Sequence, residues 1–189
     1  MQEAESDIQL MEQVKAGRES AFKELVKRHH QSIYNLCYRY VGKHEDAEEV
    51  AQDVFIRLYR SADTYQPTAK LSTFLYRIAV NLSLNRVRDR KRKRWMSLEI
   101  LREEKGVEFE GSSRDHPDVS LELKEKQIQV RKAIDSLPEN QRTAVLLHRF
   151  QGLSYEEIAE VMDCSVSAVE ARLHRAKLGL KKKLKKVIE

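Results

Sequence analysis

The chain has 189 residues, of which 41% are hydrophobic and 34% charged, and its formal net charge is +5. This length supports one large or two small domains, and the basic excess favours a polyanionic partner. Three prolines and six glycines argue against an all-β fold. Two cysteines, Cys37 and Cys164, offer neither a disulfide framework nor a zinc spacing. With no long apolar run or signal peptide, we expect a cytoplasmic protein that does not insert directly into a membrane.

The first 61 residues read as three helices. Ser6 or Asp7 caps a short helix that stops at Gly17, and a long helix with apolar residues at three- and four-residue steps ends at Gly42. A third helix, from about 44 to 61, carries apolar residues on its buried side, namely Ala47, Val50, Ala51, Val54, Phe55 and Leu58.

The other side of this third helix is acidic. Its acids, within nine residues, are Glu45, Asp46, Glu48, Glu49 and Asp53. Such a face would repel DNA, so we expect it to contact a protein. Favourable charge near a helix N-terminus explains the first three acids without a partner. Glu49, Gln52 and Asp53 lie further along and are the better interface candidates.

A polar loop over 63–71 precedes a helix that Ser72 is expected to cap. This helix ends in a basic run, 86–94, with seven basic residues against one acid. Aromatic and amide side chains nearby could stack on or hydrogen-bond unpaired bases, as in proteins that bind single strands. They are Tyr65, Phe74, Tyr76, Asn81 and Asn85, although Phe74 also fits the apolar period of the core.

From Trp95 to about Asp118 the helical period fails and the composition becomes polar and acidic. We predict a flexible linker over 96–118, between domains at 1–95 and 119–189. About 24 residues span up to about 80 Å when extended, so the two domains could bind well-separated sites on one ligand. Two further helices are expected beyond the linker, one ended by Pro138 and one over 140–150.

Residues 152–177 spell two short helices joined by a tight turn, which is typical of a helix-turn-helix. Ser154 with Glu157 predicts a capping box for the first helix, and Ser167 with Glu170 predicts one for the second. Asp163 lies where the turn needs a left-handed residue. An ordinary helical hairpin is the alternative, but eight Lys or Arg residues between 172 and 186, with no acid, favour phosphate binding. The lysines at 181–183 and 185–186 could equally be a solvated helix end.

Four segments in this order and spacing resemble a bacterial RNA polymerase sigma factor of the extracytoplasmic-function (ECF) group. They cover residues 46–55 (DAEEVAQDVF), 71–81 (LSTFLYRIAVN), 137–142 (LPENQR) and 152–159 (GLSYEEIA) continuing into 172–177 (RLHRAK). The resemblance implies an all-α fold, with two small helical domains joined by a flexible linker and a helix-turn-helix in the C-terminal one. It also implies three partners: core RNA polymerase, promoter DNA and an anti-sigma factor.

The resemblance assigns three sets of residues. Core-polymerase contacts fall on Glu49, Gln52, Asp53 and Phe55. Contacts to the −10 element fall on Lys70, Ser72, Thr73, Arg77, Asn81, Asn85, Arg86 and Arg88, with loop residues 65–71 forming a pocket for a flipped base. Contacts to the −35 element fall on Ser167, Ala168, Glu170, Ala171, Arg172, Arg175 and Lys177.

Two points stay open at this level. Glu170 could accept a hydrogen bond from cytosine N4 or serve only in the cap with Ser167.

A conventional duplex-binding regulator, or an enzyme acting on nucleic acid, would also explain the basic charge. The acidic helix and the second basic run count against the regulator. Against the enzyme, the sequence shows no clustered carboxylates, metal-ligand spacing, Gly-rich phosphate loop or nucleophile–base pair, so we expect no catalysis, no metal and no cofactor.

Overall fold

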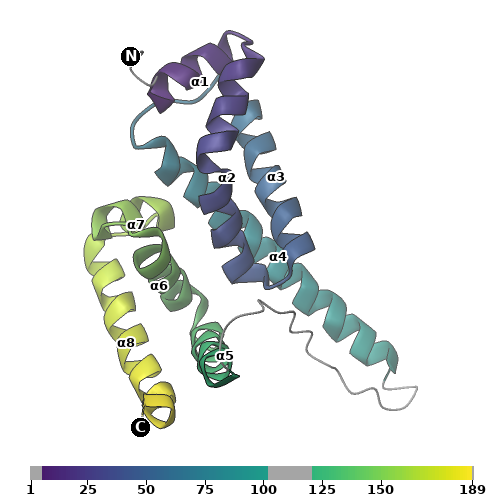
Figure 1. Ribbon diagram of the computed structural model, residues 1–189, viewed down its shortest axis with the longest axis vertical. Coiled ribbons are helices and arrows are strands. Elements are labelled where there is room, and N and C mark those ends of the chain that lie inside the picture. Colours follow the sequence, from purple (N-terminus) through teal and green to yellow (C-terminus); the bar gives the residue numbers. More distant parts are fainter. Residues whose placement is uncertain (1–5, 102–120, 189) are drawn as a thin grey trace.

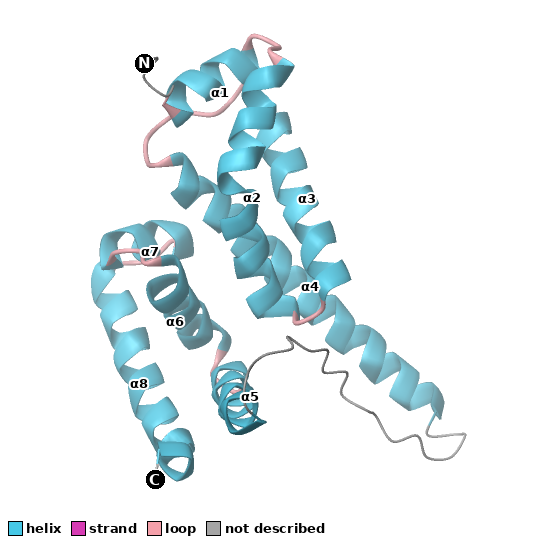
Figure 2. Cartoon of the chain, in the orientation of Figure 1, coloured by secondary structure: helices cyan, strands magenta, loops and turns pink. Residues whose placement is uncertain are grey.

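The computed structural model describes residues 6–101 and 121–188, and within those ranges all regular structure is helical (Figures 1 and 2). The helices are α1 (Asp7–Lys15), α2 (Glu19–Val41), α3 (His44–Arg60), α4 (Leu71–Leu101), α5 (Leu121–Asp135), α6 (Glu139–Gln151), α7 (Tyr155–Met162) and α8 (Val166–Ile188). None of these helices has the length and apolar content that crossing a bilayer requires.

The helices α1 to α4 form the N-terminal domain, with α2, α3 and α4 packed on one another. Its core consists of large side chains that solvent barely reaches, among them Leu25, Ile33, Leu36, Leu58 and Leu75. The predicted apolar faces of α2 and α3 are the faces that pack here. Cys37 is fully buried in this core, and burial raises the pKa of its thiol to about 11, so it packs as a small apolar residue.

Local sequence signals set most helix ends. The Ser6 hydroxyl accepts from Gln9 N–H, and the Gln9 side chain accepts from Ser6 N–H, which makes a capping box for α1. Gly42 ends α2 in the left-handed region at φ 76°, as expected. The prediction for α4 was wrong at its start, because the helix begins at Leu71 and Ser72 lies inside its first turn.

The helix α4 also continues past the predicted boundary at Trp95 and ends at Leu101. At 1.5 Å per residue its 31 residues measure about 46 Å, so its C-terminal part projects beyond the other helices of the N-terminal domain (Figure 1). Of the linker predicted at 96–118, residues 102–118 lie outside the described ranges.

The helices α5 to α8 form the C-terminal domain, in which α8 packs against α5, α6 and α7. Leu147, Ile158 and Val169 are fully buried between them. The two domains are in contact with each other: α7 packs on α4, and α6 packs on α2. Separate sites at the ends of an extended linker were the expectation, but here the promoter-facing candidates of one domain lie against the other.

Candidate nucleic-acid interface

The outer face of α3 presents the acidic residues that the sequence analysis singled out. Glu49, Gln52 and Asp53 are exposed, while Phe55 is only 5% exposed and stacks on His30, with 6.2 Å between ring centroids. Phe55 therefore belongs to the domain core and does not reach the surface. Ile56 and Tyr59 are exposed beside the acids. The sequence analysis missed these two, although their position off the apolar stripe was a usable signal.

Ion pairs join this acidic face to α4. Arg86 binds Glu49, and its Nε lies 3.6 Å from an oxygen of Asp46. Arg90 lies 3.9 Å from the other oxygen of Asp46 and donates to the carbonyl of Val41. The charge of Arg86, a −10 candidate, is thus compensated within its own domain.

The side chains of the other −10 candidates differ in solvent exposure. Thr73 is 2% exposed, so its part can only be to position neighbouring side chains. Ser72 is half-buried, and the exposed candidates are Lys70, Arg77, Asn81, Asn85 and Arg88. Because the exposed α4 residues recur at three- and four-residue steps, they share one face of the helix.

The 65–71 loop, predicted to hold a flipped base, presents Gln66, Pro67 and Thr68 to solvent. Tyr65 is half-buried and meets Phe74 edge to face, with 5.5 Å between centroids. The Tyr65 hydroxyl is buried with no hydrogen-bond partner, and desolvation raises its pKa. The pair could offer an aromatic edge to a base, but the base pocket itself stays a prediction.

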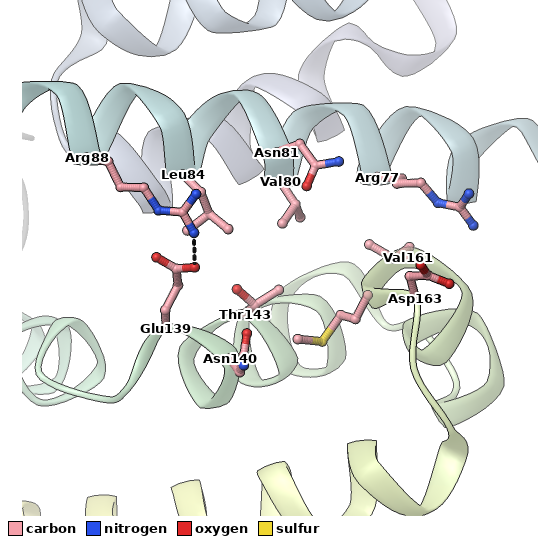
Figure 3. Close-up of a pocket in the computed structure, with 11 residues that line it drawn as sticks. Arg77, Val80, Asn81, Leu84, Arg88, Glu139, Asn140, Thr143, Val161 and Asp163 are labelled. Carbon is pink, nitrogen blue, oxygen red and sulfur yellow. Dashed lines mark hydrogen bonds and ion pairs between the residues drawn. The ribbon is translucent and has the colours of Figure 1, made fainter.

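A cavity of about 440 Å³ lies between α4 and part of the C-terminal domain (Figure 3). On one side, α4 contributes the polar side chains of Arg77, Asn81 and Arg88, which point toward the opposite wall. That wall comes from α6, α7 and the turn after α7, and includes Glu139, Asn140, Thr143 and Asp163. Two domains thus build this polar cavity from residues more than fifty positions apart.

Three −10 candidates bond directly across this gap. Lys70 Nζ lies 2.7 Å from Glu157 Oε1, Arg77 donates to the carbonyl of Glu160 at 2.6 Å, and Arg88 donates to Glu139 at 2.5 Å. The bond between Lys70 and Glu157 raises the pKa of the lysine and lowers the pKa of the carboxyl group. Basic residues that a polyanion would need are engaged by the protein itself.

The helix-turn-helix forms as predicted at its first helix and turn. Ser154 and Glu157 make the capping box of α7. Asp163 follows α7 in the left-handed region at φ 49°, and Cys164 N–H donates to the carbonyl of Ala159 at 3.0 Å. The second capping box was wrong. Ser165 caps α8, because its hydroxyl accepts from Ala168 N–H at 3.2 Å.

Glu170 therefore loses the capping role that the sequence predicted for it. Since Ser165 supplies the cap, Glu170 and Ser167 are exposed on the first turns of α8 without the reciprocal bonds of a capping box. The cap with Ser167 therefore does not account for Glu170, and its readout of cytosine stays a prediction.

The buried residues Val169 and Ala176 fix the rotation of α8. Away from these buried residues Ser167, Glu170, Arg175 and Lys177 are exposed, while Ala168, Ala171 and Arg172 are half-buried. Arg172 donates to Cys164 Sγ at 2.9 Å, so it spans the turn between α7 and α8. Further along, lysines 181–183 and Lys185 are exposed, and Lys183 donates to Ser136 at 2.5 Å.

Among the residues that the structure describes, no three His, Cys, Asp or Glu side chains converge as metal ligands would. His29 pairs with Asp7 at 2.8 Å and His30 with Glu48 at 3.3 Å.

Comparison with known proteins gives two family matches. Residues 25–93 match Sigma-70 region 2, and residues 127–180 match Sigma-70, region 4. The chain is 35% identical over 180 residues to the ECF RNA polymerase sigma factor SigW of Bacillus subtilis, covering 93% of this chain and 95% of SigW.

Two solved structures are similar over most of the chain. CnrH, in complex with the cytosolic domain of CnrY, matches with a TM-score of 0.69 and 26% identity, covering 95% of this chain and 97% of CnrH. The sigma factor RpoE of Bartonella quintana, in complex with the anti-sigma factor NepR, matches with a TM-score of 0.65 and 25% identity, covering 87% of this chain and 96% of RpoE.

Proposed function

Because the chain belongs to the ECF group of RNA polymerase sigma factors, we propose that it binds core polymerase through the outer face of α3 and recognises promoters through α4 and α8. One observation carries the proposal. The exposed acids Glu49 and Asp53 lie on α3, whereas the exposed −10 candidates of α4 share one face of that helix and further exposed bases lie on α8. A protein partner and two DNA elements can therefore be bound by separate surfaces.

For the polymerase contact, the geometry favours Gln52, Asp53 and Ile56. They are exposed at neighbouring positions of α3, where an apolar side chain flanked by polar ones makes a small docking surface. Glu49 joins this docking surface once its ion pair with Arg86 is replaced by a contact with the polymerase. Phe55 contributes by packing beneath this surface.

For the −10 element, the exposed amides of Asn81 and Asn85 are suited to hydrogen bonds with unpaired base edges. Lys70, Arg77 and Arg88 would bind the backbone on either side. Extruding a base costs a few kcal/mol, which base stacking and backbone charge can offset. Melting by binding alone needs no nucleotide hydrolysis, so we propose that the chain is not an enzyme.

For the −35 element, α8 enters the major groove with its first turns toward the bases. Ser167 and Glu170 reach base edges, Arg175 reaches a base or a phosphate further along the groove, and Lys177 binds a phosphate. Arg172 is tied to the turn and positions α8, with its remaining N–H groups open to a phosphate.

We further propose that an anti-sigma factor controls the chain, which would work in the cytoplasm with the polymerase. The support is the similarity to RpoE, whose solved structure holds the anti-sigma factor NepR.

Reconstituted transcription tests the proposal. Purified chain with core polymerase should initiate at specific sites of the source genome, and mapped start sites should share two upstream elements. Asp53→Arg should weaken core binding measured without DNA, while Asp63→Arg, beyond the end of α3, should not. A chain that footprints a duplex operator alone but never supports initiation would be a conventional regulator, and the proposal would be wrong.

A further inference from the structure

The C-terminal part of α4 presents a large aromatic side chain to solvent. Trp95, the only tryptophan of the chain, is 73% exposed, and its neighbour Met96 is 58% exposed. Among the large apolar side chains whose exposure the structure describes, Trp95 is the most exposed. This part of α4 projects beyond the other helices of the N-terminal domain (Figure 1), so the core of that domain does not cover the indole.

Trp95 lies on the face of α4 that carries the −10 candidates. At 3.6 residues per turn, positions 77, 81, 85, 88, 92 and 95 fall within about 40° of a common line along the helix. At 1.5 Å per residue, Trp95 lies about 10 Å beyond Arg88 and about 21 Å beyond Asn81. A stacked strand advances about 3.4 Å per nucleotide, so a strand that follows this face reaches Trp95 about three nucleotides after Arg88.

Cations lie close to Trp95 on this part of the helix. Lys91 and Arg92 precede it by four and three residues, so both are its neighbours on the helix surface. Lys91 and Lys93 are exposed, and neither has an ion-pair partner in the part of the chain that the structure describes. Arg92 lies 3.1 Å from Asp89, but the two side chains are 72% and 57% exposed, and a pair this exposed is readily exchanged for a phosphate.

The chemistry of this face favours one kind of partner. A helix that lies in a membrane surface needs a wide apolar face, whereas the row that leads to Trp95 is polar and cationic. An acidic protein could pair with the cations but would have no relation to the row of −10 candidates. An unpaired DNA strand satisfies both features, because its phosphates bind cations and a base of any identity can stack on an indole. In a duplex the faces of the bases are already covered by their neighbours.

We propose that Trp95 is a base-stacking platform, flanked by Lys91 and Arg92, that extends the −10 face of α4 by two turns and binds a further unpaired nucleotide of the promoter strand. The proposal rests on the proposed role of α4 in binding that strand. Hydrogen bonds from Asn81 and Asn85 select bases, whereas stacking on the indole accepts any base. Trp95 therefore adds affinity and length of contact without changing the sequence that α4 recognises.

The single tryptophan makes the site directly observable. In the full chain at low salt, a mixed-sequence DNA strand of twenty nucleotides should quench the fluorescence of Trp95 to saturation, because a base stacked on the indole quenches its excited state. The annealed duplex of the same sequence should quench less. Absence of quenching by the strand, or stronger quenching by the duplex or by an RNA strand of the same sequence, overturns the proposal. So does a shift of the emission to shorter wavelength with anionic phospholipid vesicles while the DNA strand has no effect.

Variants at this position separate stacking from simple apolar contact. Trp95→Ala should weaken binding of the labelled strand, measured by fluorescence anisotropy, by about 5- to 100-fold. Trp95→Phe keeps an aromatic face and should retain part of the affinity, whereas Trp95→Leu should lose as much as Trp95→Ala. Tyr59→Ala is the matched control, because it removes an exposed aromatic side chain from the outer face of α3 and should leave strand affinity unchanged. Circular dichroism checks that each variant is folded.

Transcription with core polymerase keeps this proposal apart from the proposed function. If the parent initiates but Trp95→Ala binds the strand as tightly as the parent, the stacking platform is overturned and the proposed function stands. Equal affinity of the Trp95→Leu and Trp95→Phe variants would also overturn it, because an apolar contact without stacking would then suffice. A parent that binds the strand through Trp95 but never initiates overturns the proposed function instead.

Discussion

The turn between α7 and α8 offers a direct test of how the helix-turn-helix is built. Asp163 is the one non-glycine residue with positive φ in the ranges 6–101 and 121–188. Its φ of 49° and ψ of 60° lie in the left-handed region, where a Cβ costs about 1–2 kcal/mol and Asn and Asp are tolerated best. A series of substitutions at this position should therefore rank by backbone tolerance and not by polarity or size.

We expect Asp163→Asn to match the parent, Asp163→Ala to cost about 1 kcal/mol, and Asp163→Val to cost about 2 kcal/mol because a β-branched side chain fits the region worst. Asp163→Gly should be close to neutral, since relief of strain offsets the greater entropy of the unfolded chain. For a domain of this size, 2 kcal/mol lowers the melting temperature by roughly 8–16 °C.

Thermal and urea unfolding followed by circular dichroism would measure the series in the full chain. Glu156→Val is the control, because it puts the same side chain at an exposed position with ordinary helical backbone in α7; it should cost less than about 1 kcal/mol. Asp163→Val and Asp163→Asn unfolding at the same temperature would refute the assignment of backbone strain to this turn.

Three other predictions concern charge. Arg175→Ala should weaken binding of a −35 duplex by about 1–3 kcal/mol if the contact is to guanine, and an unchanged dissociation constant would remove Arg175 from the reader. Because its partner Lys70 lowers the pKa of Glu157, this pair stabilises the contact between the two domains above the ordinary carboxyl value of 4.5, and that stabilisation is lost as pH falls through the lowered value. The difference in urea stability between parent and Glu157→Gln should therefore vanish in acid; a difference that persists there would contradict the pairing. Glu49→Gln should remove one of the two ion pairs of Arg86, leaving the pair with Asp46, and steepen the salt dependence of single-strand binding by up to about 0.7 log units; an equal slope would contradict a phosphate contact of Arg86.

Sequence signals were sufficient where a local rule determines the backbone. Gly42 and Asp163 adopt the left-handed conformations that their positions predicted, and Ser154 forms its capping box with Glu157. At Phe55 two kinds of inference disagreed: helical periodicity placed it in the core, and the family resemblance placed it at the polymerase. In the structure Phe55 is buried, as helical periodicity predicted.

The failures arose where residue type alone does not decide conformation. Ser165 and Ser167 are both good caps, and the choice depends on which of them leaves the turn with extended backbone, which the sequence pattern does not specify. The interdomain contacts were missed for a different reason. Tyr40 and Thr143 are 103 positions apart, and each looks like an ordinary member of its own helix. A hydrogen bond between them produces no regular spacing of residues that could be recognised in the sequence.

The ion pairs of α4 also bear on how such a protein can bind DNA at all. Arg86 is paired with an acid of α3, and Arg88 with an acid of α6. Phosphate binding is then an exchange of one anion for another and not the neutralisation of isolated charges, so its net electrostatic gain is small. Base contacts from Asn81 and Asn85 can select a sequence. Displacing these acids from the arginines would favour DNA binding. A polymerase that binds the outer face of α3 would free Arg86 from its acid when promoter DNA is within reach.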